Sequence, residues 1–436
     1  MRLSMFKNRV FPIIIGFVLV LISCGSKSKD DSVKNNEILK QVQHDSLLKL
    51  NDEIIVGAHQ INNYLPLLKG KRVGIVANQT SVIKVRGGIS GLKNSEASGL
   101  EITTIRYEHI IDSLLKRNVN IKKVFAPEHG FRGEADAGEL VKDGIDTKTN
   151  LPIVSLYGKN RKPSPAQLAD LDVVIFDIQD VGARFYTYIS SLHYVMEACA
   201  EANIPVMILD RPNPNGNYID GPILETKHKS FVGMHPIPVV HGMTIGEYAK
   251  MINGQGWLDH NIICDLTVIE MQNYKHDDTY SSPIKPSPNL PNAKSINLYP
   301  SLCFFEGTNV NAGRGTSKQF QIYGSPYLDK TVYNFKYIPM PNDASKYPKH
   351  DGVLCYGEDL STHKDLNQLD LSYLIKAYQN SIDKTVFFNT FFTNLAGTKA
   401  LQIQIESGVS EQDIRETWAD GLSTFKKVRS MYLIYE

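Results

Sequence analysis

The chain has 436 residues, a formal net charge of +1 at pH 7 and 42% hydrophobic residues. This near-neutral charge gives no electrostatic case for a nucleic acid or an acidic partner, so no nucleic-acid partner is predicted. Beyond an N-terminal leader and a polar stretch, about 385 residues remain, enough for two domains with separate cores.

Residues 1–23 have the pattern of a bacterial lipoprotein signal peptide. A basic start precedes an apolar run from Val10 to Ile22. This run is shorter than a typical membrane-spanning helix. The run ends in Leu-Ile-Ser-Cys24-Gly, so we expect export and lipidation of Cys24, which would anchor the protein to a bacterial membrane, facing the periplasm or the cell surface. An ordinary secretory signal or a short membrane anchor is the alternative. Residues 24–51 are polar and charged and are predicted to be a tether.

The first domain is predicted over residues 52–282, where apolar runs alternate with helix-like segments. The apolar runs are Lys71–Asn78, Lys123–Ala126, Leu151–Leu156, Asp172–Asp177, Ile204–Asp210 and Ile237–His241, and the helix-like segments are His59–Leu68, Tyr107–Asn118, Ser164–Ala169, Ser190–Ala202 and Thr244–Asn253. This alternation favours an α/β fold with a mainly parallel sheet covered on both faces. The long stretch from Thr80 to Arg106 is rich in Gly and Ser and is predicted to be an insertion or a flap.

Polar and charged side chains follow five of these predicted strands. They are Asn78; Glu128, His129 and Arg132; Asp177, Asp180, Arg184, Tyr186 and Tyr188; Asp210 and Arg211; and His241. Open α/β sheets bind ligands beyond the carboxyl ends of their strands, so we expect these groups to share one cleft. Two structural roles are also expected. Thr244-Ile-Gly-Glu247 has the pattern of a capping box, and Asp210 and Arg211 can pair to brace their loop.

No metal site and no cofactor are predicted. Four cysteines beyond the leader, Cys199, Cys264, Cys303 and Cys355, form no C-x-x-C pair and lie in mostly apolar runs, so buried free thiols are expected, although an exported protein can pair two of them. The histidines lack the H-E-x-x-H spacing. The first strand is not followed by G-x-G-x-x-G, and the loop around Gly313 lacks the spacing of a P-loop.

The second domain is predicted over residues 283–436. Prolines are dense from Pro283 to Pro300, and within this stretch Lys285-Pro-Ser-Pro-Asn289-Leu-Pro is interpreted as an extended linker. A glycine-rich loop with Glu306, Asn309 and Arg314 follows, and we expect it to form a wall that closes over the cleft of the first domain. The rest mixes a short strand (Gly352–Tyr356) with helices, which indicates a smaller α+β domain. The expected helices are Asp370–Asn380 and Gln412–Val428.

Five ordered motifs resemble the DUF1343 family, whose characterised members are exo-β-N-acetylmuramidases of the NamZ type. The motifs are Phe125-Ala-Pro-Glu-His-Gly-Phe-Arg-Gly133, Phe176-Asp-Ile-Gln-Asp-Val-Gly-Ala-Arg-Phe-Tyr-Thr-Tyr188, Asp210-Arg-Pro-Asn-Pro214, His241-Gly-Met-Thr-Ile-Gly-Glu247 and Gly307-Thr-Asn-Val-Asn-Ala-Gly-Arg-Gly-Thr316. The resemblance spans about Ile54 to Glu436. It implies a Rossmann-like domain, a smaller C-terminal domain and a site in the cleft between them. The implied reaction removes N-acetylmuramic acid from the non-reducing end of peptidoglycan fragments, so the expected partners are peptidoglycan-derived muramyl saccharides. This sequence departs from the family pattern in an insertion at Ile83–Arg106, near the cleft.

The roles expected in such a reaction follow from chemistry. Glycoside hydrolysis needs a proton donor and a second group that supplies or activates a nucleophile. Glu128 is predicted to be the donor, with Asp177, Asp180 or Glu306 as the second group. Arg132, Arg184 and Arg314 are candidates for the lactyl carboxylate of muramic acid, and Tyr186 and Tyr188 for its ring. The remaining polar groups are assigned to substrate binding: Asn78, His129, Asp210, Arg211, His241 and Asn309.

Two other functions remain open at this stage. One is a surface-anchored protein that binds glycans without catalysis. The other is an esterase acting on cell-wall substituents, which the absence of a G-x-S-x-G nucleophile elbow disfavours.

Overall fold

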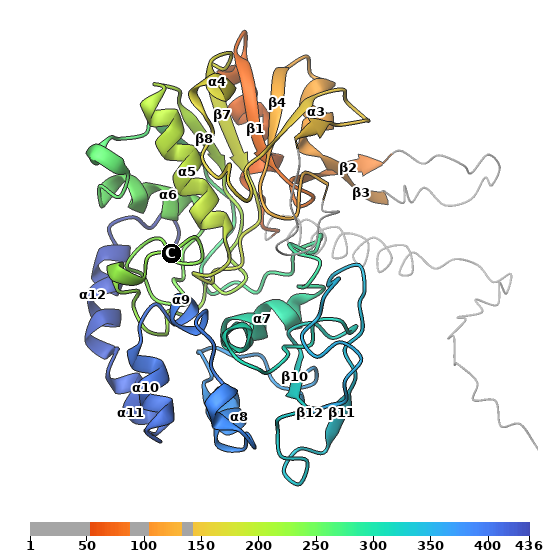
Figure 1. The fold of residues 1–436 in the computed structure, drawn as a ribbon. Helices are drawn as coiled ribbons and strands as arrows, with labels where there is room; N and C mark the ends of the chain where they lie inside the picture. Colours follow the sequence, from red (N-terminus) through yellow and green to blue (C-terminus); the bar gives the residue numbers. More distant parts are fainter. Residues whose placement is uncertain (1–52, 88–103, 133–142) are drawn as a thin grey trace, which may run out of the picture. The chain divides into compact units, whose positions relative to one another are not determined.

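Strand β1 (Arg72–Ala77) lies at the centre of a sheet in the computed structural model, which describes residues 53–87, 104–132 and 143–436 (Figure 1). The sheet order is β5-β6-β4-β1-β7-β8-β9, and all neighbours pair in parallel except β5 with β6. The other strands are β4 (Asn120–Ala126), β5 (Gly144–Ile145), β6 (Pro152–Ser155), β7 (Val173–Asp177), β8 (Val206–Leu209) and β9 (Leu266–Ile269). The mainly parallel sheet predicted from the sequence is confirmed.

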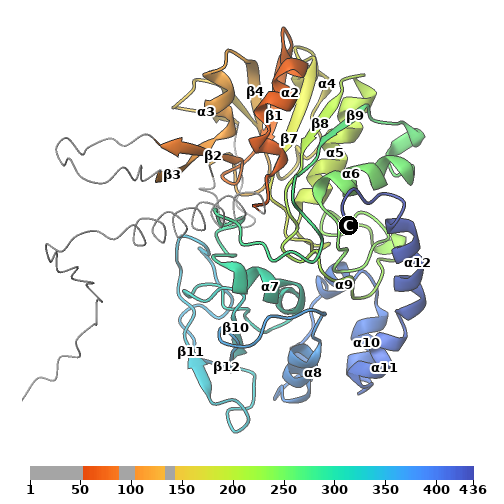
Figure 2. The same cartoon turned by 180° about the vertical axis from the view of Figure 1, so that it is seen from behind.

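Side chains alternate between the two faces of the sheet, and each face is covered by its own helices. In β7, Val173 and Ile175 pack in one core cluster, whereas Val174 and Phe176 pack in another. The first face is covered by α2 (Ile61–Tyr64) and α3 (Ile110–Leu115), and the second by α5 (Tyr188–Glu201) and α6 (Ile245–Gly254) (Figures 1 and 2). The continuous apolar strands follow from this burial on both sides.

The direction of the chain through the sheet reverses at β1. From β1 the chain passes to β4 on one side, whereas β7 pairs with β1 on the other side and leads on to β8. Connections that leave in opposite directions open a crevice at the carboxyl ends of such strands. The ends in question are Ala77, Ala126 and Asp177, so the fold positions a ligand site beyond these three residues.

One strand predicted for the first domain is wrong, and one parallel strand of the sheet was not predicted. Ile237–His241 forms no ladder, only single bridges from Val240 to Ala183 and to Asp220. The last parallel strand is instead β9, a short edge strand with partly exposed side chains, whose flanking Asp265 and Glu270 hide its apolar pattern. The predicted insertion contributes an antiparallel pair, β2 (Val82–Gly87) with β3 (Thr104–His109), and residues 88–103 lie outside the described part.

Capping side chains set the starts of several helices. The predicted capping box is confirmed at α6, where the Thr244 side chain and Glu247 satisfy each other's backbone N–H groups. Asn292 and Ser295 form another box at α7 (Ala293–Leu302), which begins just after the segment predicted to be a linker. Pro300 lies in the last turn of α7, where the missing N–H removes one hydrogen bond without breaking a longer helix.

The C-terminal part combines a small antiparallel sheet with short helices, which confirms the predicted α+β character. The sheet has the order β10 (Ile322–Ser325), β12 (Cys355–Asp359), β11 (Phe335–Tyr337). The predicted helix Gln412–Val428 is split at Trp418 into α11 (Glu411–Glu416) and α12 (Ala419–Arg429). The remaining helices are α4 (Pro165–Leu168), α8 (Ser372–Gln379), α9 (Phe392–Ala396), α10 (Ala400–Glu406) and the 3-10 turns η1 (Gly57–His59), η2 (Leu65–Leu68), η3 (Thr226–His228), η4 (Asp259–Asn261), η5 (Cys303–Gly307) and η6 (Lys384–Val386).

Residues 54–436 form one compact unit, and one core cluster reaches from the sheet to the C-terminal helices. The boundary predicted near residue 283 therefore stays a prediction. The predicted signal peptide, Cys24 and the tether up to residue 51 lie outside the described residues. Within the described residues, no helix has the length and apolar character needed to cross a membrane. The four cysteines there are free and buried, as predicted.

Candidate active site

A cavity of about 480 Å³ opens beyond the carboxyl end of β4. Its walls come from the loop after β4, the start of α5, the proline-rich stretch, α7 with η5, the glycine-rich loop and the loop before β12. The lining residues are Glu128, His129, Phe185, Tyr186, Thr187, Tyr188, Val232, Ser287, Asn289, Leu290, Tyr299, Cys303, Glu306, Asn311, Ala312, Arg314, Phe320, Ser345, Tyr347, Lys349, Phe391 and Leu395. Both parts of the chain that were predicted to frame a cleft thus contribute to one cavity.

Glu128 is held at the wall by the turn that ends β4. The N–H of Gly130 donates to the carbonyl oxygen of Pro127 at 3.0 Å, and Gly130 has a φ of 76°. His129 also has a positive φ, 69°, although it is not glycine and is buried. Backbone strain of this kind costs on the order of 1–3 kcal/mol and persists where surrounding structure enforces it, often at functional sites. The strained turn fixes the direction in which Glu128 leaves the sheet.

Two hydroxyl groups hold the Glu128 carboxylate. Thr187 Oγ1 donates to Oε2 of Glu128 at 2.6 Å, and Thr187 is the residue that precedes α5. The hydroxyl of Tyr157 also hydrogen-bonds the Glu128 side chain, and burial together with that carboxylate raises the pKa of Tyr157 to about 12. The backbone of Glu128 is tied as well, because Tyr188 Oη lies 3.4 Å from its carbonyl oxygen. The carboxylate is therefore held from several sides.

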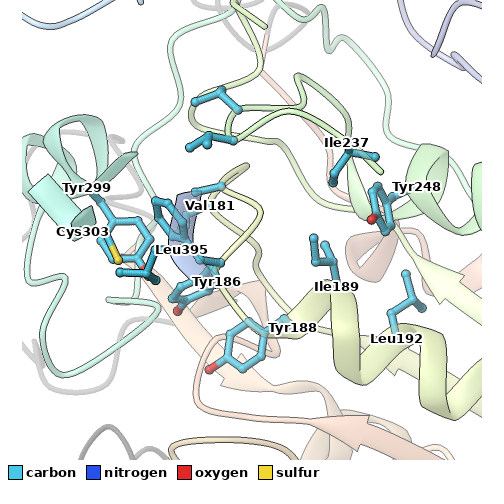
Figure 3. Packing of buried hydrophobic residues seen from close by; sticks show 14 of the residues in the cluster. Val181, Tyr186, Tyr188, Ile189, Leu192, Ile237, Tyr248, Tyr299, Cys303 and Leu395 are labelled. Atoms are coloured by element: carbon cyan, nitrogen blue, oxygen red, sulfur yellow. The ribbon is translucent and has the colours of Figure 1, made fainter. Parts of the chain in front are cut away.

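Tyr186, Tyr188 and Tyr299 are among the lining residues of the cavity. Figure 3 shows these three side chains where they pack with other buried apolar residues. The Tyr186 and Tyr188 rings meet edge to face with centroids 4.8 Å apart, and Tyr299 approaches Tyr186 at 5.9 Å. Tyr186 Oη donates to the carbonyl oxygen of Pro286 at 2.9 Å, and Asn78 Nδ2 donates to Tyr188 Oη at 2.9 Å. Asn78 thus lies behind the wall and orients a lining ring.

A second carboxylate and its cation line another part of the cavity. Arg314 Nε lies 3.0 Å from Oε1 of Glu306, and both residues are in the lining. The guanidinium of Arg314 also lies 5.5 Å from the centre of the Phe320 ring. Beside this pair, Lys349 Nζ donates to the carbonyl oxygens of Phe305, Thr308 and Val310, and burial lowers its pKa. Within the described lining, Glu128 and Glu306 are the two carboxylates.

Six of the predicted site residues are brought together here: Glu128, His129, Tyr186, Tyr188, Glu306 and Arg314. The others lie outside the lining. Asn309 is close in sequence to Glu306, but its side-chain amide is absent from the lining and has no hydrogen-bond partner in the described structure.

Asp177 and Arg211 form a buried ion pair instead of facing the cavity. Arg211 Nε and Nη2 donate to the two carboxylate oxygens of Asp177 at 2.6 and 3.0 Å. Asp210 accepts from Gly246 N, Thr244 Oγ1 and Tyr435 Oη, each within 2.8 Å. The predicted pairing of the Asp210 and Arg211 side chains is therefore wrong, because each side chain has other partners. These contacts favour structural roles for Asp177, Asp210 and Arg211 over the predicted roles in the reaction.

Asp180 and His241 are also buried behind the cavity wall. Asp180 Oδ2 accepts from Gly182 N at 2.7 Å and lies 3.8 Å from His241 Nε2. Burial raises the pKa of Asp180 to about 7, whereas burial lowers the pKa of His241 to about 3. A carboxyl group in an apolar setting resembles a proton donor, but neither residue lines the cavity.

Two of the arginines predicted to bind the lactyl carboxylate are engaged elsewhere. Arg132 is paired with Asp146 through two hydrogen bonds of 2.9 and 2.7 Å. Arg184 is fully buried and donates to four backbone carbonyl oxygens, those of Pro222, Ile237, Leu395 and Ala396. This environment favours a structural role for Arg184 over the predicted substrate-binding role, because Arg184 is absent from the lining and its four Nη hydrogen bonds go to backbone carbonyl oxygens.

Several lining residues were missed by the sequence analysis. Ser287, Asn289 and Leu290 belong to the stretch interpreted as a linker, whose prolines signal a fixed extended path as well as a connection. Tyr347 and Lys349 lie in a loop without any motif, so no sequence signal pointed to them. Thr187 lies between Tyr186 and Tyr188 in its motif, and no role was predicted for it.

Comparison with known proteins identifies relatives of this chain. The chain matches the N-terminal domain of the exo-β-N-acetylmuramidase NamZ at residues 73–294 and its C-terminal domain at residues 297–435. A Bacillus subtilis (strain 168) protein described as peptidoglycan β-N-acetylmuramidase NamZ is 39% identical over 392 residues, which is 86% of this chain and 89% of that protein.

Two crystal structures of DUF1343 family proteins from Bacteroides fragilis NCTC 9343 share the fold. One has a TM-score of 0.76 at 45% identity, covering 88% of this chain and 99% of the other. The second has a TM-score of 0.69 at 27% identity, covering 88% and 100%. The chain therefore belongs to the NamZ family, also described as DUF1343, as the five sequence motifs predicted.

Proposed function

We propose that this protein is an exo-acting β-N-acetylmuramidase that releases N-acetylmuramic acid from the non-reducing end of peptidoglycan fragments, as in cell-wall turnover. The observation that carries the proposal is the Glu128 carboxylate, fixed by the Thr187 hydroxyl at the wall of a cavity that also holds Glu306. Membership of the NamZ family supports the substrate class. A cavity of about 480 Å³ is of the size that holds small ligands.

In this reaction, Glu128 protonates the oxygen of the leaving sugar. Its carboxylate has one oxygen held by Thr187, so the orientation of the group is set before substrate arrives. Glu306 takes the second role and supplies or activates the nucleophile, because glycosidases flank the scissile bond with two carboxyl groups. Arg314 holds Glu306 by an ion pair. Tyr186 and Tyr299 offer ring faces and edges against which a sugar packs.

The decisive experiment compares Glu128→Gln with the wild type on a natural muramyl disaccharide and on an aryl β-N-acetylmuramide. Glutamine keeps the shape of the side chain but delivers no proton. General acid catalysis contributes on the order of a hundred- to ten-thousand-fold, so we expect a loss of that size on the disaccharide. The loss should be much smaller on the aryl substrate, whose leaving group needs little protonation.

Glu416→Gln, an exposed carboxylate outside the cavity, is the matched control and should behave as wild type. An unchanged rate of Glu128→Gln on the disaccharide would sink the assignment of Glu128. Binding of muramyl saccharides without any turnover by the wild-type protein would instead favour a glycan-binding protein.

We also propose that the protein is exported and anchored to a bacterial membrane by lipid on Cys24. The support is the Leu-Ile-Ser-Cys24 end of the N-terminal apolar run. Cells that express Cys24→Ala should lose the protein from the membrane pellet, whereas Ser26→Ala should leave it there. Unchanged sedimentation of Cys24→Ala with membranes contradicts the anchor.

A further inference from the structure

We propose that Arg161 binds the lactyl carboxylate that distinguishes a muramyl substrate from a glucosaminyl one. The inference rests on the proposed function, because it names a specificity-determining residue of the same site. Arg161 lies in the loop after β6, one strand further out in the sheet than β4, which carries Glu128. No sequence motif singled it out.

The guanidinium of Arg161 lies over an aromatic ring whose neighbour in sequence lines the cavity. Its Cζ lies 4.2 Å from the centre of the Phe231 ring, which in turn stacks on Tyr194 with centroids 6.3 Å apart and planes 19° apart. The residue after Phe231, Val232, lines the cavity. The carbonyl oxygen of Phe231 accepts a hydrogen bond from Ser190 Oγ at 2.7 Å, which ties this support to the first turn of α5.

The N-terminal end of the same loop contacts the carboxylate of Glu128. Tyr157, four residues before Arg161, hydrogen-bonds the side chain of Glu128, and the positive charge of Arg161 acts on the Tyr157 hydroxyl. Arg161 is therefore connected to two lining residues. It contacts Phe231, which precedes Val232, and its charge acts on Tyr157, which hydrogen-bonds Glu128. The charge of Arg161 therefore lies next to two residues, Phe231 and Tyr157, that connect directly to the lining.

The backbone at Arg161 is fixed on both sides. Asn160 Nδ2 donates to the carbonyl oxygen of Ser155 at 2.6 Å, which closes the loop on itself. Lys162 Nζ lies 2.7 Å from carboxylate oxygens of both Glu197 and Glu201 in α5. A side chain on such an anchored loop loses less conformational freedom when it binds a ligand than a free surface arginine does.

Arg161 is exposed, and within the described residues its guanidinium has neither a hydrogen bond nor a carboxylate partner. In contrast, Arg132 is paired with Asp146, Arg314 with Glu306, and Arg184 with backbone carbonyls. A guanidinium presents parallel N–H groups that match a carboxylate in two hydrogen bonds, and its flat face can remain on an aromatic ring while it does so. The chemistry of Arg161 thus fits a carboxylate brought by the substrate.

The test compares Arg161→Ala, Arg161→Lys and Lys159→Ala, an exposed cation two residues away in the same loop. The substrates are an aryl β-N-acetylmuramide and the matching β-N-acetylglucosaminide, which lacks the lactyl group. For Arg161→Ala, we expect kcat/KM on the muramide to fall on the order of ten- to a hundred-fold, with an unchanged rate or inhibition constant for the glucosaminide. Arg161→Lys should recover part of the loss, and Lys159→Ala should match wild type.

A third substrate separates two sources of carboxylate. In a muramyl-L-alanine glycoside the lactyl carboxylate is an amide, and the free carboxylate lies further out. Arg161→Ala should affect this substrate little, so a loss on this substrate alone would overturn the lactyl assignment. Equal losses on muramide and glucosaminide, or no loss at all, would also overturn it.

Lys346→Ala provides a further check, because Lys346 adjoins the lining residue Tyr347. A selective loss with Lys346→Ala in place of Arg161→Ala would move the carboxylate site and refute the proposal. Turnover of the muramide by the wild type tests the proposed function separately from all of these variants.

Discussion

Thr187 Oγ1 lies 2.6 Å from Oε2 of Glu128, and this contact joins the end of β4 to the start of α5 across the sheet edge. The hydroxyl donates to the carboxylate, so the proton donor proposed for the reaction is oriented by a residue from another element. An oriented group loses less conformational entropy on reaching the reactive geometry than a freely rotating one. Thr187 thus orients the proposed proton donor by a direct hydrogen bond.

Thr187→Val should therefore lower kcat on the order of ten- to a hundred-fold while the protein stays folded. Valine keeps the shape of threonine but removes a hydrogen bond to a carboxylate. KM should change little, because the contact acts on Glu128 and not on the sugar. Thr187→Ser, which keeps the hydroxyl, should retain most of the activity. Steady-state kinetics of both variants test this, and equal losses in valine and serine variants would contradict it.

Glu306→Gln should lose activity on natural and activated aryl substrates alike. The second carboxylate of a glycosidase acts on the nucleophile, so an activated leaving group cannot replace it. We expect losses of more than about a hundred-fold on both substrates, in contrast to Glu128→Gln. Glu358→Gln is the matched control, since Glu358 is likewise paired with a cation, Lys376, but lies outside the cavity. Retained aryl hydrolysis by Glu306→Gln would shift the second role away from Glu306.

Arg184→Lys should destabilise the protein more than it affects catalysis per folded molecule. The guanidinium serves four carbonyl oxygens on two sides, and an ammonium group has only three donors on one atom. Unpaired buried acceptors cost about 1–3 kcal/mol each, so the free energy of unfolding should fall by at least about 2 kcal/mol. Thermal or urea unfolding measures the effect.

An independent variant probes the same contact. A Cβ at Gly397 would lie 2.7 Å from Arg184 Nη2, and Gly397 has a φ of 73°, so Gly397→Ala should destabilise as well. A loss of kcat/KM in Arg184→Lys without any loss of stability would restore the substrate-binding role predicted from the sequence.

Asp180→Asn should change how stability depends on pH. The folded-state pKa of Asp180 is about 7 against an ordinary value of 3.8, so the folded protein binds this proton more tightly than the unfolded chain. The stability that Asp180 contributes is therefore lost as pH rises from about 4 to about 7. Asparagine stays neutral, and its variant should gain on the wild type over this range by up to about 1.4 kcal/mol per pH unit.

Urea unfolding of both proteins at about pH 5 and about pH 8 measures this difference. The neighbouring His241 has a lowered pKa and contributes the opposite slope, but it is present in both proteins. A difference in stability that does not change with pH would show that Asp180 is ionised in the folded protein throughout.

The sheet, its helices and the position of the site were predictable because periodicity and strand ends carry that information. Glu128 was singled out because Pro127 and Gly130 confine it to a turn at the end of an apolar strand. Asp177, at the end of β7, and Asp210, just after β8, have a similar sequence setting. Yet Asp177 pairs with the buried Arg211, and Asp210 accepts from backbone and hydroxyl donors. Sequence alone does not separate these cases, because both a ligand and a buried donor attract a carboxylate.

The missed parts of the cavity have a different cause. Asn289 lies in a proline-rich stretch whose path depends on contacts far away in the chain, such as the bond from its Nδ2 to the carbonyl oxygen of Ala344. Tyr347 is 93% exposed, so neither burial nor periodicity marks it, although it lines the cavity. Such residues are placed by tertiary contacts between loops, and local sequence patterns do not encode those contacts.

The four hydrogen bonds that Arg184 donates to backbone carbonyl oxygens have a consequence for how substrate enters the cavity. Two of these hydrogen bonds go to the carbonyl oxygens of Pro222 and Ile237, and two go to the C-terminal end of α9. One buried cation therefore connects both regions. A hinge motion that drew these regions apart would leave a charged group without partners in an apolar interior, which is costly. The end of a saccharide should therefore enter from the solvent-facing side, past exposed side chains such as Tyr347, while the scaffold around the cavity stays closed.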